Sequence, residues 1–312
     1  MKHFTKLADV DDPAGLLQKA MEFKKAPLSQ SQPGQGKTLI LVFFNPSLRT
    51  RISTEKAAIN LGLSCIVYNA SQGWKLEFEE NMVMNTDRAE HIKEAAAVIS
   101  QYADIIGIRT FPSLTDKEKD YSDFVLNQFI EHTSVPIVSL ESAIRHPLQS
   151  LADWLTIEEL KKVERPKVVL SWAPHPKSLP QAVANSFSEW MNFADVDLTI
   201  THPEGYELAD EFVGNAKIEY DQYKAFEEAD FIYTKNWSSF KEYGQQLQVQ
   251  QDWIINGDKM AKTNNAYFMH CLPVRRNVVV TDQVIESPNS VVIQQAQNRL
   301  FAAQAVLHGL LG

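Results

Sequence analysis

The chain has 312 residues, too many for one ordinary small domain and enough for two of about 150 residues each. Its net charge of -9 at pH 7 argues against a surface that binds nucleic acid or an anionic membrane. The two cysteines, Cys65 and Cys271, are too few for a disulfide framework, which favours a reducing compartment. There is no signal-peptide core at the N-terminus and no apolar run near the ~20 residues that span a bilayer, so we expect a cytoplasmic protein.

Short apolar runs alternate with amphipathic stretches along the chain. In the first half, the pattern predicts strands at 37–44, 64–69, 104–109 and 135–140, and helices at 49–62, 90–103 and 121–133. A helix at 145–163 leads into the second half, where we expect strands at 166–172, 196–203, 230–236 and 266–272, and a helix at 180–193. Alternating strands and helices are typical of parallel sheets with crossover helices, so the predicted class is α/β.

The two halves predict two doubly wound parallel-sheet domains, joined by interdomain helices, with the active site in the cleft between them. We place the first domain at 1–147 and the second at 148–292. The last helix, at about 293–312, is expected to pack back onto the first domain.

Although the chain is acidic overall, the segments that follow its predicted strands are polar and mostly cationic. They are NPSLRTR (45–51), RTF (109–111), ESAIRHPLQ (141–149), APHPK (173–177), KNW (235–237) and HCLPVRRN (270–277). Ligands of open α/β sheets bind at the carboxyl ends of the strands, so these segments are the candidate binding residues.

The segment SLRTR stands at the expected start of the helix 49–62. A helix N-terminus offers N–H groups and a positive dipole end to an anion. Ser47 and Thr50 add hydroxyl groups, and Arg49 adds a planar fork that matches phosphate oxygens. An ordinary N-cap with surface arginines is the alternative, but the other cationic strand ends favour a phosphate site. No glycine-rich nucleotide motif accompanies it, so we expect a phosphate that is not part of a nucleotide.

Three other strand-end positions have two interpretations each. Arg109 is either a solvated strand terminus or a second ligand of a phosphate or carbonyl oxygen. His146 and Gln149 are three residues apart, which places both on one helix face, but a lone His-Pro is also a common cap. Cys271 is either a nucleophile paired with a histidine or a small wall beside the substrate. No Cys/His cluster has the spacing of metal ligands, and we expect neither a metal nor a cofactor.

Taken together, SLRTR, HPLQ and HCLP, in this order and at this spacing, resemble the aspartate/ornithine carbamoyltransferases, and the matching pattern covers essentially the whole chain. The resemblance implies that carbamoyl phosphate binds at Ser47, Leu48, Arg49, Thr50, Trp74, Arg109, His146, Gln149, Cys271, Leu272 and Arg299. It also implies a homotrimer in which the loop around Trp74, in SQGWKLEFEE (71–80), reaches the neighbouring site.

The implied reaction is attack of a neutral δ-amine on the carbamoyl carbon, with phosphate leaving. Donors aimed at the oxygens on which charge builds are the main catalytic resource. Arg49, Arg109 and His146 are the expected catalytic residues. Cys271 is then a wall of the pocket and not a nucleophile, and its carbonyl and that of Leu272 orient the amines.

Departures from the ornithine enzymes indicate the N-acylornithine branch. The Ser-Met-Gly loop with which the ornithine enzymes bind ornithine is absent. In the same region Lys235 places a cation, which suits an acidic, acylated acceptor. The enzymes that take acetylornithine carry a glutamate where this chain has Ala89, and a lysine where it has Val279. Alanine neither repels a succinyl carboxylate nor blocks its volume, although proline is more typical there.

The expected acceptor is therefore N-succinylornithine, and N-acetylornithine or ornithine is the alternative. The residues expected to bind it are Ala89, Glu141, His175, Lys235 and Arg275.

Overall fold

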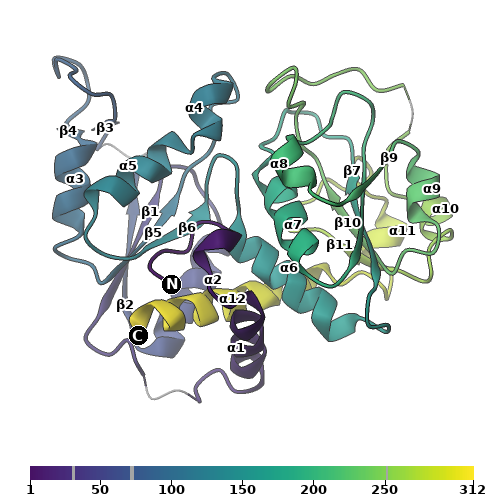
Figure 1. Ribbon diagram of the computed structural model, residues 1–312, viewed down its shortest axis with the longest axis horizontal. Helices are drawn as coiled ribbons and strands as arrows, with labels where there is room; N and C mark the ends of the chain where they lie inside the picture. The colour runs from purple at the N-terminus through teal and green to yellow at the C-terminus, as the bar shows by residue number, and fades with distance from the viewer. Residues whose placement is uncertain (30–31, 71–73, 251) are drawn as a thin grey trace. The chain divides into compact units, whose positions relative to one another are not determined.

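The computed structural model describes residues 1–29, 32–70, 74–250 and 252–312 (Figure 1). These residues form two compact units. Unit 1 is Met1–Leu148 with Arg299–Gly312, and unit 2 is Gln149–Asn298. Each unit contains a main open sheet whose neighbouring strands are all parallel, and unit 1 also has a separate two-stranded parallel ribbon. The predicted α/β class is confirmed.

The sheet of unit 1 has the strand order β2-β1-β5-β6. Its strands are β1 (Thr38–Phe43), β2 (Ser64–Asn69), β5 (Ile105–Arg109) and β6 (Ile137–Glu141), which lie where the sequence predicted them. The crossover helices are α2 (Arg49–Leu61), α3 (Ile92–Ile99) and α5 (Phe124–His132). Gly62 ends α2 with φ 80°, a left-handed conformation that glycine adopts at no steric cost.

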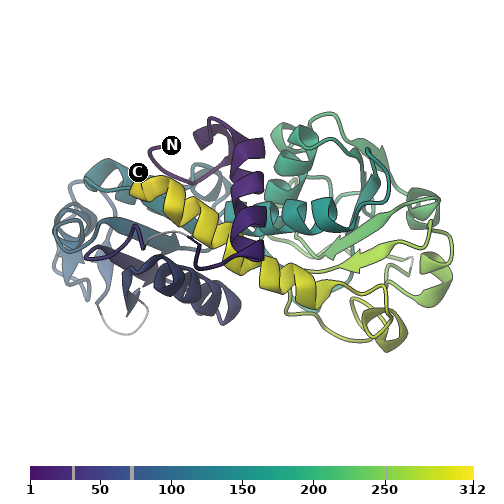
Figure 2. The ribbon, with the colours of Figure 1, turned by 90° about the horizontal axis from the view of Figure 1, so that it is seen from below.

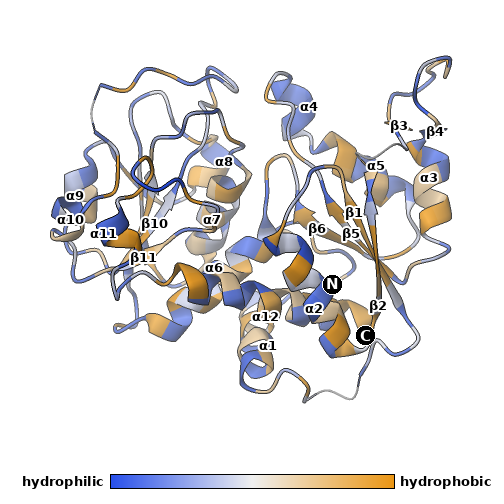
Figure 3. Cartoon of the chain, turned by 180° about the vertical axis from the view of Figure 1, so that it is seen from behind, coloured by the Kyte–Doolittle hydropathy of each residue, from blue (hydrophilic) through white to orange (hydrophobic). Residues whose placement is uncertain are grey.

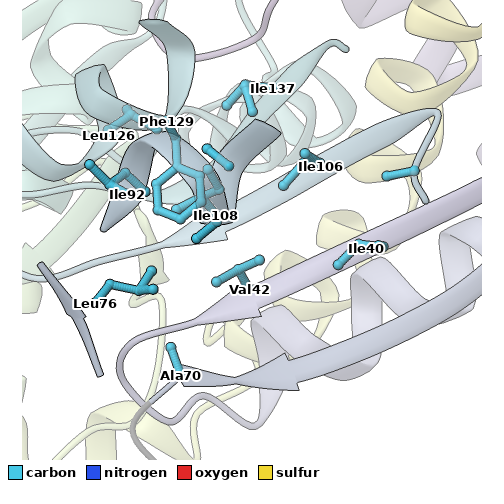
Figure 4. Close-up of a cluster of buried hydrophobic side chains, with 13 residues drawn as sticks. Ile40, Val42, Ala70, Leu76, Ile92, Ile106, Ile108, Leu126, Phe129 and Ile137 are labelled. Carbon is cyan, nitrogen blue, oxygen red and sulfur yellow. The ribbon is translucent and has the colours of Figure 1, made fainter. Parts of the chain in front are cut away.

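One face of this sheet buries an apolar cluster (Figure 4). Ile40 and Val42 of β1 and Ile106 and Ile108 of β5 point to that face, because side chains alternate along a strand. Phe129 of α5 packs against them. Figure 3 shows the hydropathy of this unit, in which β5 and β6 are hydrophobic and the helix α4 (Lys117–Tyr121) is hydrophilic. Burial of this face fixes the strands whose carboxyl ends carry the candidate site.

The sheet of unit 2 has the order β11-β10-β7-β8-β9. Its strands are β7 (Lys167–Trp172), β8 (Asp197–Thr201), β9 (Lys217–Glu219), β10 (Phe231–Lys235) and β11 (Tyr267–Met269). Only β9 was not predicted, since three residues at a sheet edge carry little periodicity. Its longer helices are α6 (Pro147–Leu160) and α7 (Ala182–Phe193).

Two further long helices are α1 (Pro13–Lys25) and α12 (Val292–Leu311). Several short elements complete the described chain: η1 (Leu7–Asp9), β3 (Leu76–Glu77), β4 (Glu90–His91), α8 (Asp210–Val213), α9 (Gln222–Phe226), α10 (Gly257–Met260) and α11 (Asp282–Ile285). The C-terminal part of α12 crosses α1, where the rings of His308 and Phe23 lie 5.4 Å apart (Figure 2). Among the described helices, none has the length and apolar character needed to cross a membrane.

Two predicted helices differ from the structure. The expected helix 90–103 begins only at Ile92, because Glu90 and His91 pair with β3 as a short parallel strand. The expected helix 121–133 is interrupted at Asp123, whose φ of 50° separates α4 from α5.

Candidate active site

In unit 1 the candidate residues lie at the carboxyl ends of three adjacent strands. The loop after β1 carries Ser47 to Thr50, Arg109 is the last residue of β5, and Glu141 is the last residue of β6. His146 follows β6 in the segment that leads into α6. This is the edge of a parallel sheet at which ligands bind.

Arg109 is the buried centre of this edge. Its Nε and Nη2 donate to Oε2 of Glu141 at 3.1 and 2.8 Å. Its Nη1 donates to the carbonyl oxygens of Asn45 and Pro46 at 3.0 and 2.6 Å. The arginine therefore fixes the loop that carries Ser47 to Thr50, and Glu141 fixes the arginine.

The start of α2 is held from two sides. The Ser47 hydroxyl accepts a hydrogen bond from the Thr50 N–H at 3.3 Å. Nη2 of Arg299, on α12, donates to the Thr50 hydroxyl at 2.6 Å, and both of these side chains are buried. Leu48, by contrast, is 68% exposed and occupies the N-cap without a capping side chain. A helix N-terminus with arginines on both sides is suited to an anion.

His146 completes the cluster in unit 1. It is 4% exposed, and its Nε2 lies 3.8 Å from Oε2 of Glu141. Seven of the predicted residues thus gather in one unit: Ser47, Leu48, Arg49, Thr50, Arg109, His146 and Arg299. Glu141, predicted to contact the acceptor, stands beside them and pairs with Arg109.

Trp74 and Ala89 lie in another part of unit 1, on the β3–β4 ribbon next to α3 (Figure 1). Nε1 of Trp74 donates to Oε2 of Glu90 at 2.8 Å, and the Ala89 N–H donates to the Lys75 carbonyl at 3.0 Å. The indole is 52% exposed. Residues 71–73 of the predicted Trp74 loop lie outside the described residues.

Unit 2 has its own cationic edge. Lys235 ends β10, His175 follows β7, and Arg275 follows β11. Nε of Arg275 donates to Nε2 of His175 at 3.1 Å, and Nδ1 of the same ring lies 3.0 Å from the carbonyl oxygen and 3.1 Å from the backbone nitrogen of Lys177. Burial lowers the pKa of His175, a hydrogen bond to the Lys177 backbone opposes this, and the charges of Arg275, Lys235 and Lys177 lower the pKa further, so the ring is neutral at pH 7. Arg276 instead forms surface ion pairs with Asp282 and Glu286.

Gln149, Cys271 and Leu272 also belong to unit 2. Nε2 of Gln149 donates to Oδ1 of Asp153 at 2.7 Å, so Gln149 and His146 have different partners despite their spacing. Cys271 is a buried, free thiol next to Tyr233, and Leu272 turns the chain with φ 53°. A neighbouring phenol does not activate a nucleophilic cysteine as a cationic partner does, which favours a wall of the pocket.

Sequence reasoning missed two polar residues that organise these segments, Asp153 and Asp123. Asp153 is fully buried and stands four residues after Gln149, a spacing that signals a contact on one helix face. Asp123 accepts from Ser142 Oγ and from the Ala143 N–H at 2.8 and 3.0 Å. In the described part of the chain, no group of three or more His, Cys, Asp or Glu side chains is placed to hold a metal ion.

Comparisons with known proteins agree on one family. The carbamoyl-phosphate-binding domain of the aspartate/ornithine carbamoyltransferases matches residues 2–159, and their aspartate/ornithine-binding domain matches 180–310. An N-succinylornithine carbamoyltransferase of Bacteroides fragilis is 55% identical over 100% of this chain and 99% of its own length. An N-acetylornithine carbamoyltransferase of Xanthomonas campestris is 37% identical over 100% of this chain and 98% of its own.

Solved structures give the same answer. An N-acetyl-L-ornithine transcarbamylase with a glutamate-to-alanine mutation, complexed with carbamyl phosphate and N-succinyl-L-norvaline, superposes with a TM-score of 0.92. It is 37% identical, and the match covers 99% of this chain and 100% of that one. With both domain models, full-length relatives and this structural match in agreement, the chain belongs to the aspartate/ornithine carbamoyltransferase family.

Proposed function

We propose that the protein transfers the carbamoyl group of carbamoyl phosphate to the δ-amino group of N2-succinyl-L-ornithine. The products are N2-succinyl-L-citrulline and phosphate, in arginine biosynthesis. The observation that carries the proposal is the 55% identity, over the full chain, to an enzyme of that name, joined to the cationic cluster at the start of α2.

In this proposal the first domain, 1–147 with the C-terminal helix, binds carbamoyl phosphate. The N-terminus of α2 and Arg49 hold the phosphate, while Arg109 and His146 face the oxygens on which charge develops. The attacking amine is neutral, and the leaving phosphate accepts its proton, so no side chain has to act as a general base. Domain closure on both substrates shields the reaction from water.

The second domain, 148–292, binds the acylornithine. A succinylornithine molecule carries two carboxylates, and the edge formed by Lys235, Arg275 and the neutral His175 offers two cations, one of which is the guanidinium that His175 orders. The hydrogen bond through Nε orders Arg275, whose two terminal NH2 groups can both donate to a carboxylate. A plain α-ammonium group would be repelled by the same edge.

Ala89 sets the preference for the acyl group. Mutants of the acetylornithine relative in which one glutamate is replaced by valine, alanine, proline or serine were all solved with N-succinyl-L-norvaline. This supports the interpretation that a small or apolar residue in place of that glutamate admits a succinyl chain. From the sequence, we assign Ala89 to the position of that glutamate.

The test is the initial rate of citrulline-type product formation with carbamoyl phosphate and three acceptors. We expect turnover of N-succinylornithine, with N-acetylornithine and ornithine at least about tenfold slower, since a desolvated cation left without its carboxylate partner costs about 1–3 kcal/mol. Comparable turnover of ornithine would contradict the role of Lys235. Turnover of N-acetylornithine alone would favour the second candidate, which the 37% identical relatives represent.

Ala89→Glu tests the specificity position directly. The new carboxylate repels the succinyl carboxylate, so we expect the preference to shift toward N-acetylornithine by at least about tenfold in kcat/KM. Ala14→Glu, at an exposed position of α1, is the matched control and should leave the preference unchanged. An unaltered preference in Ala89→Glu would refute the assignment of this residue.

We further propose that the protein is a cytoplasmic homotrimer in which Trp74 reaches the active site of a neighbouring subunit. The exposed apolar side chains Trp74, Met82 and Val83 support an interface, because a monomer rarely leaves such neighbours in water. Two free cysteines fit a reducing compartment.

A further inference from the structure

Asp153 lies on α6, in the interior of unit 2, and is fully buried. Burying a carboxylate away from water costs several kcal/mol of free energy unless hydrogen bonds within the protein replace those lost to water. Two glutamine side chains supply them, since Nε2 of Gln149 and Nε2 of Gln295 both donate to Oδ1 of Asp153 at 2.7 Å. The proposed mechanism gives Asp153 no role, although one of its partners is a candidate substrate-binding residue.

The direction of these hydrogen bonds follows from the backbone. The His270 N–H can only donate, and it donates to Oε1 of Gln295 at 2.9 Å. The NH2 group of Gln295 must therefore point the other way, toward Oδ1 of Asp153, which makes that oxygen an acceptor. Gln149, which meets the same oxygen, has to present its own NH2 group to it. The orientation of both amides is thus fixed by chemistry and not by a choice between two similar atoms.

The NH2 group of Gln149 is held by Asp153. The carbonyl oxygen of Gln149, Oε1, is therefore the end of the amide that faces away from Asp153. Carbamoyl phosphate has an NH2 group, which needs an acceptor, and a carbonyl oxygen, which needs donors. A glutamine turned the wrong way would offer a donor to a donor. Such a mismatch leaves a desolvated group without a partner and costs about 1–3 kcal/mol.

We propose that Asp153 is a positioning residue, which fixes the Gln149 amide so that its oxygen accepts from the NH2 group of carbamoyl phosphate. The inference rests on the proposed function for the identity of the ligand. The same network reaches the loop after β11 through Gln295 and His270, next to Cys271 and Leu272. Tyr233, on β10, adjoins both Asp153 and Cys271, and burial followed by the charge of Asp153 raises its pKa, so the phenol remains protonated.

The first experiment measures the amide itself and needs no turnover. In protein labelled with 15N-glutamine, the side-chain signal of Gln149 is assigned by its loss in Gln149→Ala. We expect its NH2 protons to exchange with water at least about tenfold faster in Asp153→Leu, because their acceptor is gone. In Asp153→Asn, which keeps the shape and one acceptor oxygen, we expect a smaller increase. Unchanged exchange in both variants would overturn the proposal.

The second experiment asks whether Asp153 acts through Gln149. We expect Asp153→Leu to raise KM for carbamoyl phosphate at least about tenfold and to leave KM for the acceptor within about twofold. In a Gln149→Ala background the same substitution should add less than about twofold, since the residue it positions is absent. An equal loss in both backgrounds would show a general structural role and refute the positioning role.

Thr156→Val is the matched control. Thr156 is another buried polar residue of α6, which accepts from Asn298 at 2.9 Å and has no bond to Gln149. It should leave Gln149 exchange and KM for carbamoyl phosphate unchanged. If Asp153→Leu does not fold, Asp153→Asn decides by the same measurements, with a rise in KM of at least about threefold expected. If the wild-type protein does not turn over carbamoyl phosphate, the proposed function fails, while the exchange experiment still decides whether Asp153 holds Gln149.

Discussion

At the scale of single residues, Arg109 fits neither of the two interpretations that its place in the sequence offered. It is neither a solvated strand end nor a side chain reserved for a ligand, because three of its nitrogen atoms bind protein groups. Guanidinium has five N–H donors, four of which are used in these bonds. The remaining donor, on Nη2, is then held at a fixed place, where we propose that it meets a ligand oxygen, as preorganised electrostatic catalysis requires.

Glu141→Gln tests this dependence. The substitution keeps the volume of the side chain and removes the charge that orients Arg109, so a buried guanidinium loses its counter-ion. We expect the free energy of unfolding to fall by about 3–5 kcal/mol, as for other broken buried pairs. We also expect the affinity for carbamoyl phosphate to fall at least about tenfold, measured by calorimetry, because the misplaced donor no longer meets the ligand.

The control for this prediction is Glu55→Gln, which breaks the exposed pair with Arg51 on α2. An exposed pair four residues apart on a helix contributes only about 0.3–0.5 kcal/mol, so stability and affinity should hardly change. If Glu141→Gln behaved like Glu55→Gln, the pair with Arg109 would have no organising role.

At the scale of elements, the segment that leads to His146 is held by a residue from another part of the chain. Asp123 is the N-cap of α5, and its carboxylate accepts hydrogen bonds from Ser142 and Ala143, in the connection between β6 and α6. Burial raises the pKa of this carboxyl group to about 6, despite the opposing effect of its hydrogen bonds and of Arg145. The contact is therefore sensitive to pH in a range that enzymes meet.

The sign of that dependence is opposite to that of most carboxylates. In the folded protein Asp123 becomes protonated below about pH 6, whereas in the unfolded chain it becomes protonated only near pH 3.8. Between these two pH values the folded state therefore binds more protons than the unfolded state. Its contribution to the free energy of unfolding rises as the pH falls through this window, by up to about 3 kcal/mol. In Asp123→Asn the contribution is absent.

We expect the difference in free energy of unfolding between wild type and Asp123→Asn to grow in favour of wild type from pH 7 to pH 4, as measured by urea denaturation. Asp116→Asn, at the exposed N-cap of α4, should show a difference that does not grow. A constant or shrinking difference for Asp123→Asn would mean that the carboxyl group is not buried as described.

The same elements show what the sequence can and cannot reveal. Strands β1, β5 and β6 were predicted because buried parallel strands are continuous apolar runs, and their polar carboxyl ends marked the candidate residues. The break at Asp123 was not predicted, since a left-handed aspartate is stabilised by residues about 20 positions further along the chain. Asp153 was missed for a related reason: a carboxylate in the apolar part of α6 is explained only by the two glutamines that donate to it, one of which lies 142 positions further along the chain.

At the scale of the whole molecule, the proposed trimer separates residues of one site onto two subunits. In that proposal Arg49 acts within its own subunit, whereas Trp74 acts on the site of a neighbour. The exposed Trp74 is fixed through its indole N–H to Glu90, so its ring is presented in one orientation before any subunit joins. A rigid aromatic side chain of this kind loses little conformational freedom when it becomes buried in an interface.

Mixing two inactive variants tests the arrangement. Arg49→Ala removes the phosphate ligand from a subunit's own site, and Trp74→Ala removes the side chain donated to the neighbour's site, so each variant alone is expected to have less than about 1% of wild-type activity. When the two are unfolded and refolded together, a site is intact wherever a Trp74→Ala subunit receives the tryptophan of an Arg49→Ala neighbour. Random assembly of a closed ring then restores about one quarter of wild-type activity.

Mixing the variants without refolding should restore none, provided that subunits do not exchange during the assay. Light scattering of the refolded mixture should give the mass of three chains. If activity stays at the level of the separate variants while the mixture is trimeric, Trp74 serves its own subunit or none. If the mass is that of one chain, the exposed apolar side chains of unit 1 are not an interface, and the shared site is wrong.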